Sequence, residues 1–162
     1  MSNIRVKANG KIVDFENYLA ECIRIAVDNA AEKAVDYLAQ YIMENWYETY
    51  EPKQYQRTYD FLESASKTET TISGRNNISA VCMIYFDTNK IIPRYYGPGR
   101  LNPHVDYNGA STAESIPRMI EFGSVFHGRG KTDGLKSMEA TIVMLERDFP
   151  NMVQKELRKM GL

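Results

Sequence analysis

The most constraining feature of the sequence is a long stretch without helix-breaking residues. Between Gly10 and Pro52 there is no other glycine or proline, and in the middle an apolar doublet recurs every fourth residue. A spacing of four suits a helix and does not suit a strand, whose faces alternate every second residue. The pattern predicts one amphipathic helix from about Phe15 to Tyr50. The doublets are Cys22/Ile23, Ala26/Val27, Ala30/Ala31, Ala34/Val35, Leu38/Ala39 and Ile42/Met43.

The length and the drift of this apolar stripe bear on assembly. Four residues at about 100° each overshoot a full turn by roughly 40°, so the two ends of the stripe face different sectors of the helix. At ~1.5 Å per residue the helix is roughly 50 Å long, which is more than a domain of this size covers by itself. We therefore expect part of the helix to pack on its own domain and part on a neighbouring copy.

Composition sets the broad class of the protein. A chain of 162 residues with 43% apolar and 25% charged residues is typical of one globular domain, here residues 1–162. The net charge of −1 gives the whole molecule no general attraction to nucleic acid or to anionic membranes. No stretch approaches the ~18 apolar residues of a membrane span, and we expect synthesis in the cytoplasm without membrane association. Cys22 and Cys82 lie in apolar runs, which predicts free thiols rather than a disulfide framework.

The rest of the chain reads as short strands and a closing helix. Alternating apolar residues on both sides of Asn9-Gly10 predict a hairpin, and Asp14 stands where a helix N-cap belongs. The order predicts an α+β fold in which a small, mostly antiparallel sheet packs against a long N-terminal helix and a C-terminal helix. The further expected elements are a short amphipathic turn or helix at 57–65, a hairpin of 68–73 with a central strand at 78–86, a strand at 119–126 broken at Gly123, and a helix capped by Ser137. Pro150 either starts a second helix or kinks the first.

A long irregular segment from Asp87 to Ser115 interrupts this order. It has no usable periodicity and combines prolines and glycines with Tyr95, Tyr96 and Tyr107. Loops of this length inside a domain are usually functional, disordered or docked on a partner. The aromatic content argues against simple disorder, so we expect a docking role.

Few residues in the chain carry catalytic chemistry. His104 and His127 each stand alone in a loop without a carboxylate or cysteine at ligand spacing, and neither cysteine has an electropositive neighbour in the sequence. The segment 97–100 has a proline where a phosphate loop needs a backbone N–H. Glu44 and Glu48 lie one helical turn apart, which is more typical of a solvated face than of an acid pair. We expect no catalytic residues, no cofactor and no metal.

Two stretches carry a resemblance to a known family. The first reads Trp46-Tyr47-Glu48-Thr49-Tyr50-Glu51-Pro52 and continues through Arg57-Thr58 to Ser64, and the second is Ile120-Glu121-Phe122-Gly123-Ser124 before a glycine-containing loop and a C-terminal helix. They resemble the tail-completion and head-to-tail joining proteins of the neck of long-tailed bacteriophages. The family pattern often has glycine where this chain has Tyr59 and threonine where it has Ser124, and the loop at 87–115 looks like an expansion.

The resemblance implies a structural virion protein, made in the host cytoplasm, that forms a homo-oligomeric ring in the phage neck. Its implied partners are the adjoining connector and tail-tube or tail-terminator proteins, with DNA passing through the lumen without specific binding. A closed ring needs two different complementary patches on each subunit, which a helix with a rotating stripe provides. The candidate interface residues are Tyr95, Tyr96 and Arg100 in the loop and Trp46 at the helix end, although core burial is the competing interpretation for Trp46.

Two other classes stay open. A nucleic-acid-binding module would use Arg94, Tyr95, Tyr96 and Arg100 as a surface for base stacking and phosphate contacts. Salt-sensitive binding to DNA or RNA would indicate it, and the net charge argues against it. An enzyme of an unrecognised kind would have to work with carboxylates.

Overall fold

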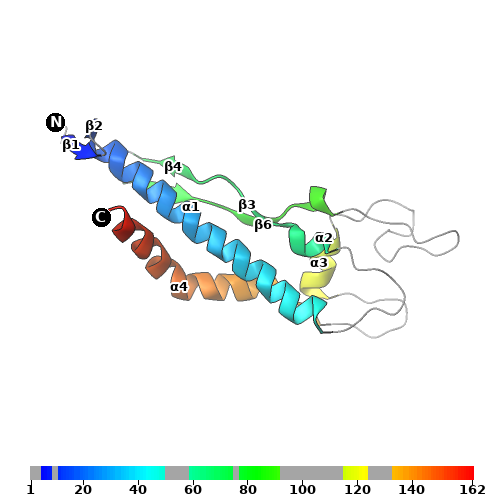
Figure 1. Ribbon diagram of the computed structural model, residues 1–162. Helices are drawn as coiled ribbons and strands as arrows, with labels where there is room; N and C mark the ends of the chain where they lie inside the picture. Colours follow the sequence, from blue (N-terminus) through cyan, green and yellow to red (C-terminus); the bar gives the residue numbers. More distant parts are fainter. Residues whose placement is uncertain (1–4, 9–10, 50–58, 75–76, 92–114, 124–132) are drawn as a thin grey trace, which may run out of the picture. The chain divides into compact units, whose positions relative to one another are not determined.

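The computed structural model describes residues 5–8, 11–49, 59–74, 77–91, 115–123 and 133–162 (Figure 1). Their contacts divide the chain into two compact units, which we describe separately. Unit 1 comprises Met1–Ala34, Lys67–Ile84 and Met144–Leu162, and unit 2 comprises Val35–Ser66 and Tyr85–Val143. The elements in chain order are β1 (Arg5–Ala8), β2 (Lys11–Asp14), α1 (Phe15–Ile42), η1 (Met43–Tyr47), α2 (Asp60–Glu63), β3 (Ala65–Lys67), β4 (Thr71–Ser73), β5 (Ser79–Val81), β6 (Ile84–Phe86), η2 (Thr88–Lys90), α3 (Ser115–Phe122) and α4 (Ser137–Lys159).

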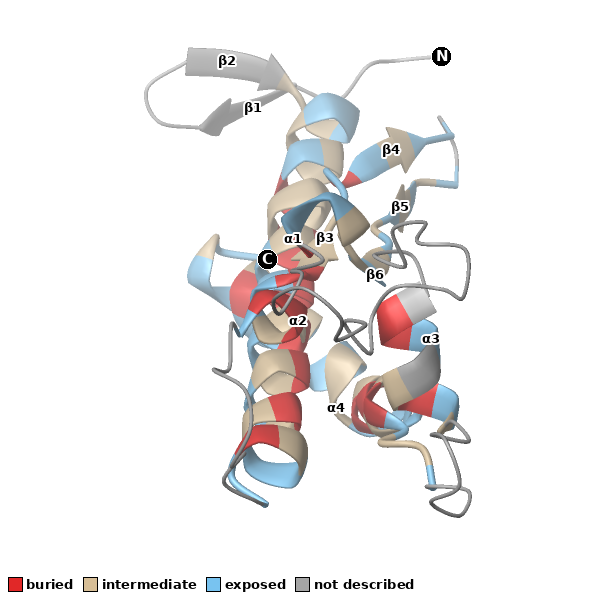
Figure 2. Ribbon diagram, turned by 90° about the vertical axis from the view of Figure 1, so that its right-hand side faces the viewer, coloured by how far each residue is buried: buried red, intermediate tan, exposed pale blue. Residues whose placement is uncertain are grey.

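The predicted α+β class is confirmed, and so is the long N-terminal helix. The Asp14 carboxylate accepts a hydrogen bond from the Glu16 N–H at 3.0 Å, as an N-cap does. The α-helix passes at Met43 into the π-helical turn η1, which ends at Tyr47, three residues before the predicted Tyr50. The first member of every apolar doublet is buried, and Figure 2 shows buried positions in red along the length of α1.

The expectation that part of this helix packs on a neighbouring copy stays a prediction, and the burial of α1 bears on it. No apolar residue of α1 is among the exposed large side chains of the described residues, so the chain itself covers the stripe. Small residues make this burial compact, because Ala26, Ala30 and Ala34 are all fully buried and let neighbouring elements approach closely. A neighbouring copy is therefore not needed to cover α1.

Two hairpins belong to unit 1. β1 and β2 pair antiparallel with Val6 opposite Val13, as predicted, while the Asn9-Gly10 turn lies outside the described residues. β4 and β5 pair antiparallel with Ile72 opposite Ala80, which confirms the second predicted hairpin. Gly74 in its turn has a φ of +87°, a conformation that favours glycine.

The predicted central strand at 78–86 is wrong. In the described residues this stretch is two short strands, because β5 pairs with β4 and β6 pairs with β3, each in a two-stranded sheet. Side chains alternate between half-buried and exposed from Ile78 to Phe86, as expected for a strand with one face on the protein and one face in solvent. We call the segment 65–86, which contains both pairs, the β-ribbon.

Unit 2 contains the short elements around α2. The turn or helix predicted at 57–65 is present as the helix α2, and Phe61 is buried against Phe86 with ring centroids 4.8 Å apart. Tyr59 precedes α2 with a left-handed φ of 58° and stacks on Tyr47 at 4.7 Å. These aromatic pairs hold α2 against η1 and β6 within this unit.

The strand predicted at 119–126 is a helix where the structure describes it. α3 runs from Ser115 to Phe122, and Gly123 follows it with a φ of 76°, the left-handed conformation that ends many helices. Pro117 lies in its first turn, where a missing N–H costs nothing, and Ile116 and Ile120 are spaced by four. Residues 124–126 lie outside the described residues.

The closing helix is one helix rather than two. α4 contains Pro150 in its interior, which decides between the two predicted alternatives. It ends at Gly161 with a φ of 87°, where the Leu162 N–H donates to the Leu157 carbonyl at 3.1 Å and the Gly161 N–H donates to the Arg158 carbonyl at 3.2 Å. This glycine-based ending was predicted.

Candidate functional site

Unit 1 contains an apolar groove of about 310 Å³. Three segments form it: α1, the part of the β-ribbon that contains β5 and β6, and the middle of α4. Val27 and Ala31 on α1 are nearly fully buried beneath it. The lining residues are Val27, Ala31, Ala80, Val81, Cys82, Ile84, Leu145 and Phe149.

The groove exists because small side chains face large ones. Ala31 and Ala80 end at Cβ, while Leu145 and Phe149 are large and only half-buried. Protein interiors are normally packed without such space, so a hollow lined by half-buried apolar side chains is a candidate binding surface.

The groove follows the open edge of a strand. It is lined by residues of the part of the β-ribbon that contains β5 and β6, and by none of β3 or β4. In the described residues β4 is the one strand that pairs with β5, so the other edge of β5 has no strand beside it. Such an edge presents free N–H and C=O groups to which a further strand can pair.

The β-ribbon also exposes apolar side chains. Val81 is 60% exposed and Met83 is 62% exposed. The solvent face of an antiparallel sheet is normally polar, so two large apolar side chains at alternate positions are unusual there. Exposed apolar groups beside a groove typically mark an interaction surface.

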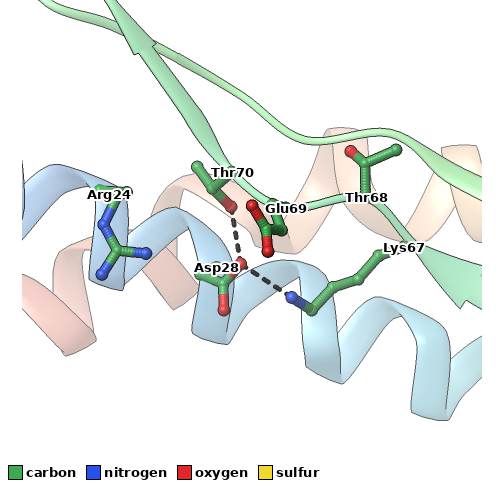
Figure 3. A pocket seen from close by; sticks show the side chains of 6 residues that line it. All are labelled: Arg24, Asp28, Lys67, Thr68, Glu69 and Thr70. Carbon is green, nitrogen blue, oxygen red and sulfur yellow. Dashed lines mark hydrogen bonds and ion pairs between the residues drawn. The ribbon is translucent and has the colours of Figure 1, made fainter.

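A second hollow in unit 1, of about 460 Å³, is polar (Figure 3). The Lys67 ammonium and the Thr70 hydroxyl both point at the Asp28 carboxylate and donate to Oδ1 at 2.7 and 2.8 Å. These hydrogen bonds, that of Lys67 first, lower the pKa of Asp28, and the bond from Lys67 to Asp28 raises the pKa of Lys67. Arg24 is paired with Glu21 at 2.7 Å. The cluster ties the β-ribbon to α1, and the charges of Asp28, Lys67 and Arg24 are engaged in ion pairs within the chain.

A buried carboxylate joins α3 to the start of α4 in unit 2. Glu121 is 6% exposed and accepts hydrogen bonds from the Ser137 N–H at 3.2 Å, the Met138 N–H at 2.9 Å and the Ser137 hydroxyl. Ser137 was predicted to cap α4, but its hydroxyl donates to Glu121 instead of accepting from the helix. The cap of α4 is therefore Glu121, at the end of α3, where a negative charge also favours the helix dipole.

The comparisons with known proteins bear on ancestry. The model of the YomN family matches residues 11–161. The chain belongs to the YomN family. This family is phage-derived, which confirms a phage origin but not a place in the neck. Neither the search of curated proteins nor the search of solved structures found a match.

The structure locates one of the four candidate interface residues of this YomN-family chain. Trp46 lies in η1, is half-buried, and its carbonyl accepts a hydrogen bond from the Thr49 hydroxyl at 2.9 Å. Tyr95, Tyr96 and Arg100 lie outside the described residues, as do Arg94, His104 and His127. The loop predicted at 87–115 is described only at its two ends, where η2 and the first residue of α3 lie.

Within the described part of the chain, no group of three or more His, Cys, Asp or Glu residues could hold a metal ion. Cys22 and Cys82 are free cysteines, as predicted. No described helix is both long and apolar enough to cross a membrane.

Sequence reasoning missed the groove and the Glu121 cap in this member of the YomN family. The groove depends on which small and large side chains meet across three segments, and no local sequence pattern shows that. The Ile120–Ser124 motif drew attention to Glu121, but it does not indicate that Glu121 binds Ser137, which lies 16 residues later.

Proposed function

We propose that this chain is a non-catalytic structural protein of the phage particle, forming a ring in the neck that joins the head connector to the tail. Its partners would be further copies of itself and the adjoining connector and tail-tube or tail-terminator proteins, with DNA passing through the lumen without specific binding. The phage-derived family supports the setting. The neck position itself comes from the resemblance of the two sequence stretches.

The observation that carries the proposal is the apolar groove beside exposed Val81 and Met83. A groove is not complementary to itself, so a second copy must present a different surface to it. Where two different surfaces meet without reciprocal exchange between the same two copies, they join subunits head to tail, and such contacts close into a ring when the rotation between subunits allows it. Self-assembly of this kind is what a neck ring requires.

The decisive experiment removes the protein from a phage that encodes it. Without the chain, infected cells should accumulate full heads and separate tails, and a plasmid copy of the gene should restore joined particles. A copy carrying Glu139→Gln, which alters an exposed residue of α4, is the matched control and should restore them equally well. Joined, infectious particles that lack the protein would overturn the proposal.

A second experiment examines the purified chain. Size-exclusion chromatography with light scattering, followed by negative-stain imaging, should show uniform rings. Tyr96→Ala and Arg100→Ala should leave the circular dichroism spectrum unchanged but weaken assembly, because these residues are the candidate contacts of the loop. Rings that form equally well in both variants would remove that loop from the interface.

A further inference from the structure

We propose that the N-terminal hairpin β1–β2 of one copy docks in the apolar groove of the next copy and adds to the open edge of β5. This inference rests on the proposed ring and names the contact that would join its subunits. The occupant of the groove is therefore a second copy of this chain.

The first argument is the state of the hairpin. In the described residues β1 and β2 form a two-stranded sheet by themselves and pair with no further strand. A lone two-stranded hairpin is marginally stable in water and needs a third strand or a packing partner. Positions 6 and 13 pair across the hairpin, and both are valine, so one of its faces has apolar residues to bury.

The second argument is reach. β2 ends at Asp14 and α1 begins at Phe15, so no linker separates the hairpin from the helix. Val27, the first groove residue on α1, lies 12 positions further on, or about 18 Å along the helix axis. A four-residue strand spans only about 13 Å. Figure 1 shows the hairpin beyond the N-terminal end of α1. The hairpin cannot reach the groove of its own chain without unwinding α1.

The third argument is charge. The hairpin strands carry Arg5, Lys7 and Lys11, and their one acidic residue, Asp14, is engaged with the Glu16 N–H. On α4, Glu146 follows the groove residue Leu145, is exposed, and forms no ion pair with any other described residue. Glu146 thus places an exposed acidic group beside the groove, with which a basic residue of the hairpin can pair.

The geometry of such a contact fits strand addition. The open edge of β5 supplies backbone hydrogen bonds, and the groove accepts the apolar positions of the added strand. Because the hairpin and the groove are different surfaces of one chain, each copy can donate to one neighbour and accept from another. This is the head-to-tail arrangement that closes into a ring.

Native Cys82 provides a direct test, because it is half-buried and lines the groove. In a Cys22→Ala background, Val6→Cys places a second thiol on the apolar face of the hairpin. Mild oxidation should then give a ladder of covalent oligomers on a non-reducing gel. Lys7→Cys, on the opposite face, is the matched control and should give about tenfold less product, since a disulfide needs its Cβ atoms within about 4.5 Å.

Two controls complete this test. Replacing Cys82 with alanine in the Val6→Cys variant should abolish the ladder. Equal cross-linking from positions 6 and 7, or a ladder that persists without Cys82, would overturn the docking mode.

Hydrogen exchange on the unaltered chain tests the hairpin contact without relying on the correct folding of any variant. The amides of residues 79–84 should be protected at concentrations where rings form and should exchange at least about tenfold faster after dilution to monomers. Unchanged exchange, or a chain that is monomeric at every concentration, would overturn the hairpin contact. Rings that form without this protection would refute the hairpin contact but not the proposed ring. Specific cross-links in a protein that the phage does not need for joining heads to tails would refute the neck function but not the hairpin contact.

Discussion

Glu121 shows how a single side chain fixes the start of a helix from a distance. Its carboxylate accepts two backbone N–H groups and a hydroxyl at the first turn of α4. Glu121→Ala leaves these buried donors without an acceptor, so we expect a loss of about 2 kcal/mol in the free energy of unfolding. Glu121→Gln keeps an acceptor but removes the charge, and should cost about 1 kcal/mol. Urea denaturation followed by circular dichroism measures both changes.

The matched control for this cap is Glu139→Gln, which alters an exposed residue in the first turn of the same helix. It removes one charge near the same helix end and should change stability by no more than about 0.5 kcal/mol. If Glu121→Ala costs as little as this control, the capping role is refuted.

Tyr59 has a left-handed φ of 58°, a conformation that favours glycine. The left-handed conformation costs roughly 1–2 kcal/mol for a residue with a Cβ, while the stack on Tyr47 returns part of that cost. Both Tyr59→Ala and Tyr59→Gly lose the stack, but glycine also relieves the strain. We therefore expect Tyr59→Gly to be about 1 kcal/mol more stable than Tyr59→Ala in chemical denaturation. Equal stabilities would show that the strain is negligible.

At the scale of single residues, the sequence could predict local roles but not partners. The Asp14 cap and the Gly161 ending follow from residues within a few positions of each other, and both were predicted. Glu121 and Tyr59 could not be assigned, because a cap from another helix and a backbone angle depend on contacts that form only in the folded chain.

At the scale of elements, Glu156 joins α4 to α1 within unit 1. It is 5% exposed and accepts hydrogen bonds from Lys33 at 2.7 Å and from Lys159 at 2.9 Å. These bonds, first that of Lys33 and then that of Lys159, lower the pKa of Glu156 from its ordinary 4.5 to about 2. The unfolded chain therefore takes up this proton before the folded chain does, as the pH falls.

This pKa shift predicts how stability depends on pH. The contribution of Glu156 is fully present above about pH 4.5 and is lost as the pH falls toward 2. The melting temperature should therefore decrease more steeply over this range in the wild-type chain than in Glu156→Gln, as followed by circular dichroism. Glu139→Gln, an exposed change on the same helix, should keep the wild-type slope. Parallel curves for wild type and Glu156→Gln would contradict the assignment.

Long periodic elements were predictable and short ones were not. The four-residue spacing defined α1 over many turns, and turn residues marked both hairpins. α3 has eight residues, and its Met119–Phe122 end followed by Gly123 looks like a strand ending at a glycine. Its helical state depends on Pro117 in the first turn and on the left-handed Gly123, which a short apolar pattern does not reveal.

At the scale of the whole molecule, the surface that we expect to mediate assembly is the β-ribbon rather than α1. The long helix seemed to need a neighbour, yet its stripe is buried by its own chain. The unsatisfied surface of unit 1 is the groove and the open β5 edge, with Val81 and Met83 beside them. Ala31 is buried in the apolar stripe of α1 and also lines the groove. Small side chains on α1 therefore contribute both to its close packing and to the space of the groove.

Val81→Thr with Met83→Gln tests this surface. Both side chains are more than half exposed, so the double variant should change the free energy of unfolding by no more than about 0.5 kcal/mol. Its assembly should weaken clearly in light scattering at matched concentration, because association would lose the apolar area of these two side chains. Ile142→Gln removes an apolar side chain of similar exposure, 53%, from α4 in unit 2 and should leave assembly of the purified chain intact. If the double variant assembles as well as the wild type, or if Ile142→Gln weakens assembly equally, subunits do not meet through the β-ribbon.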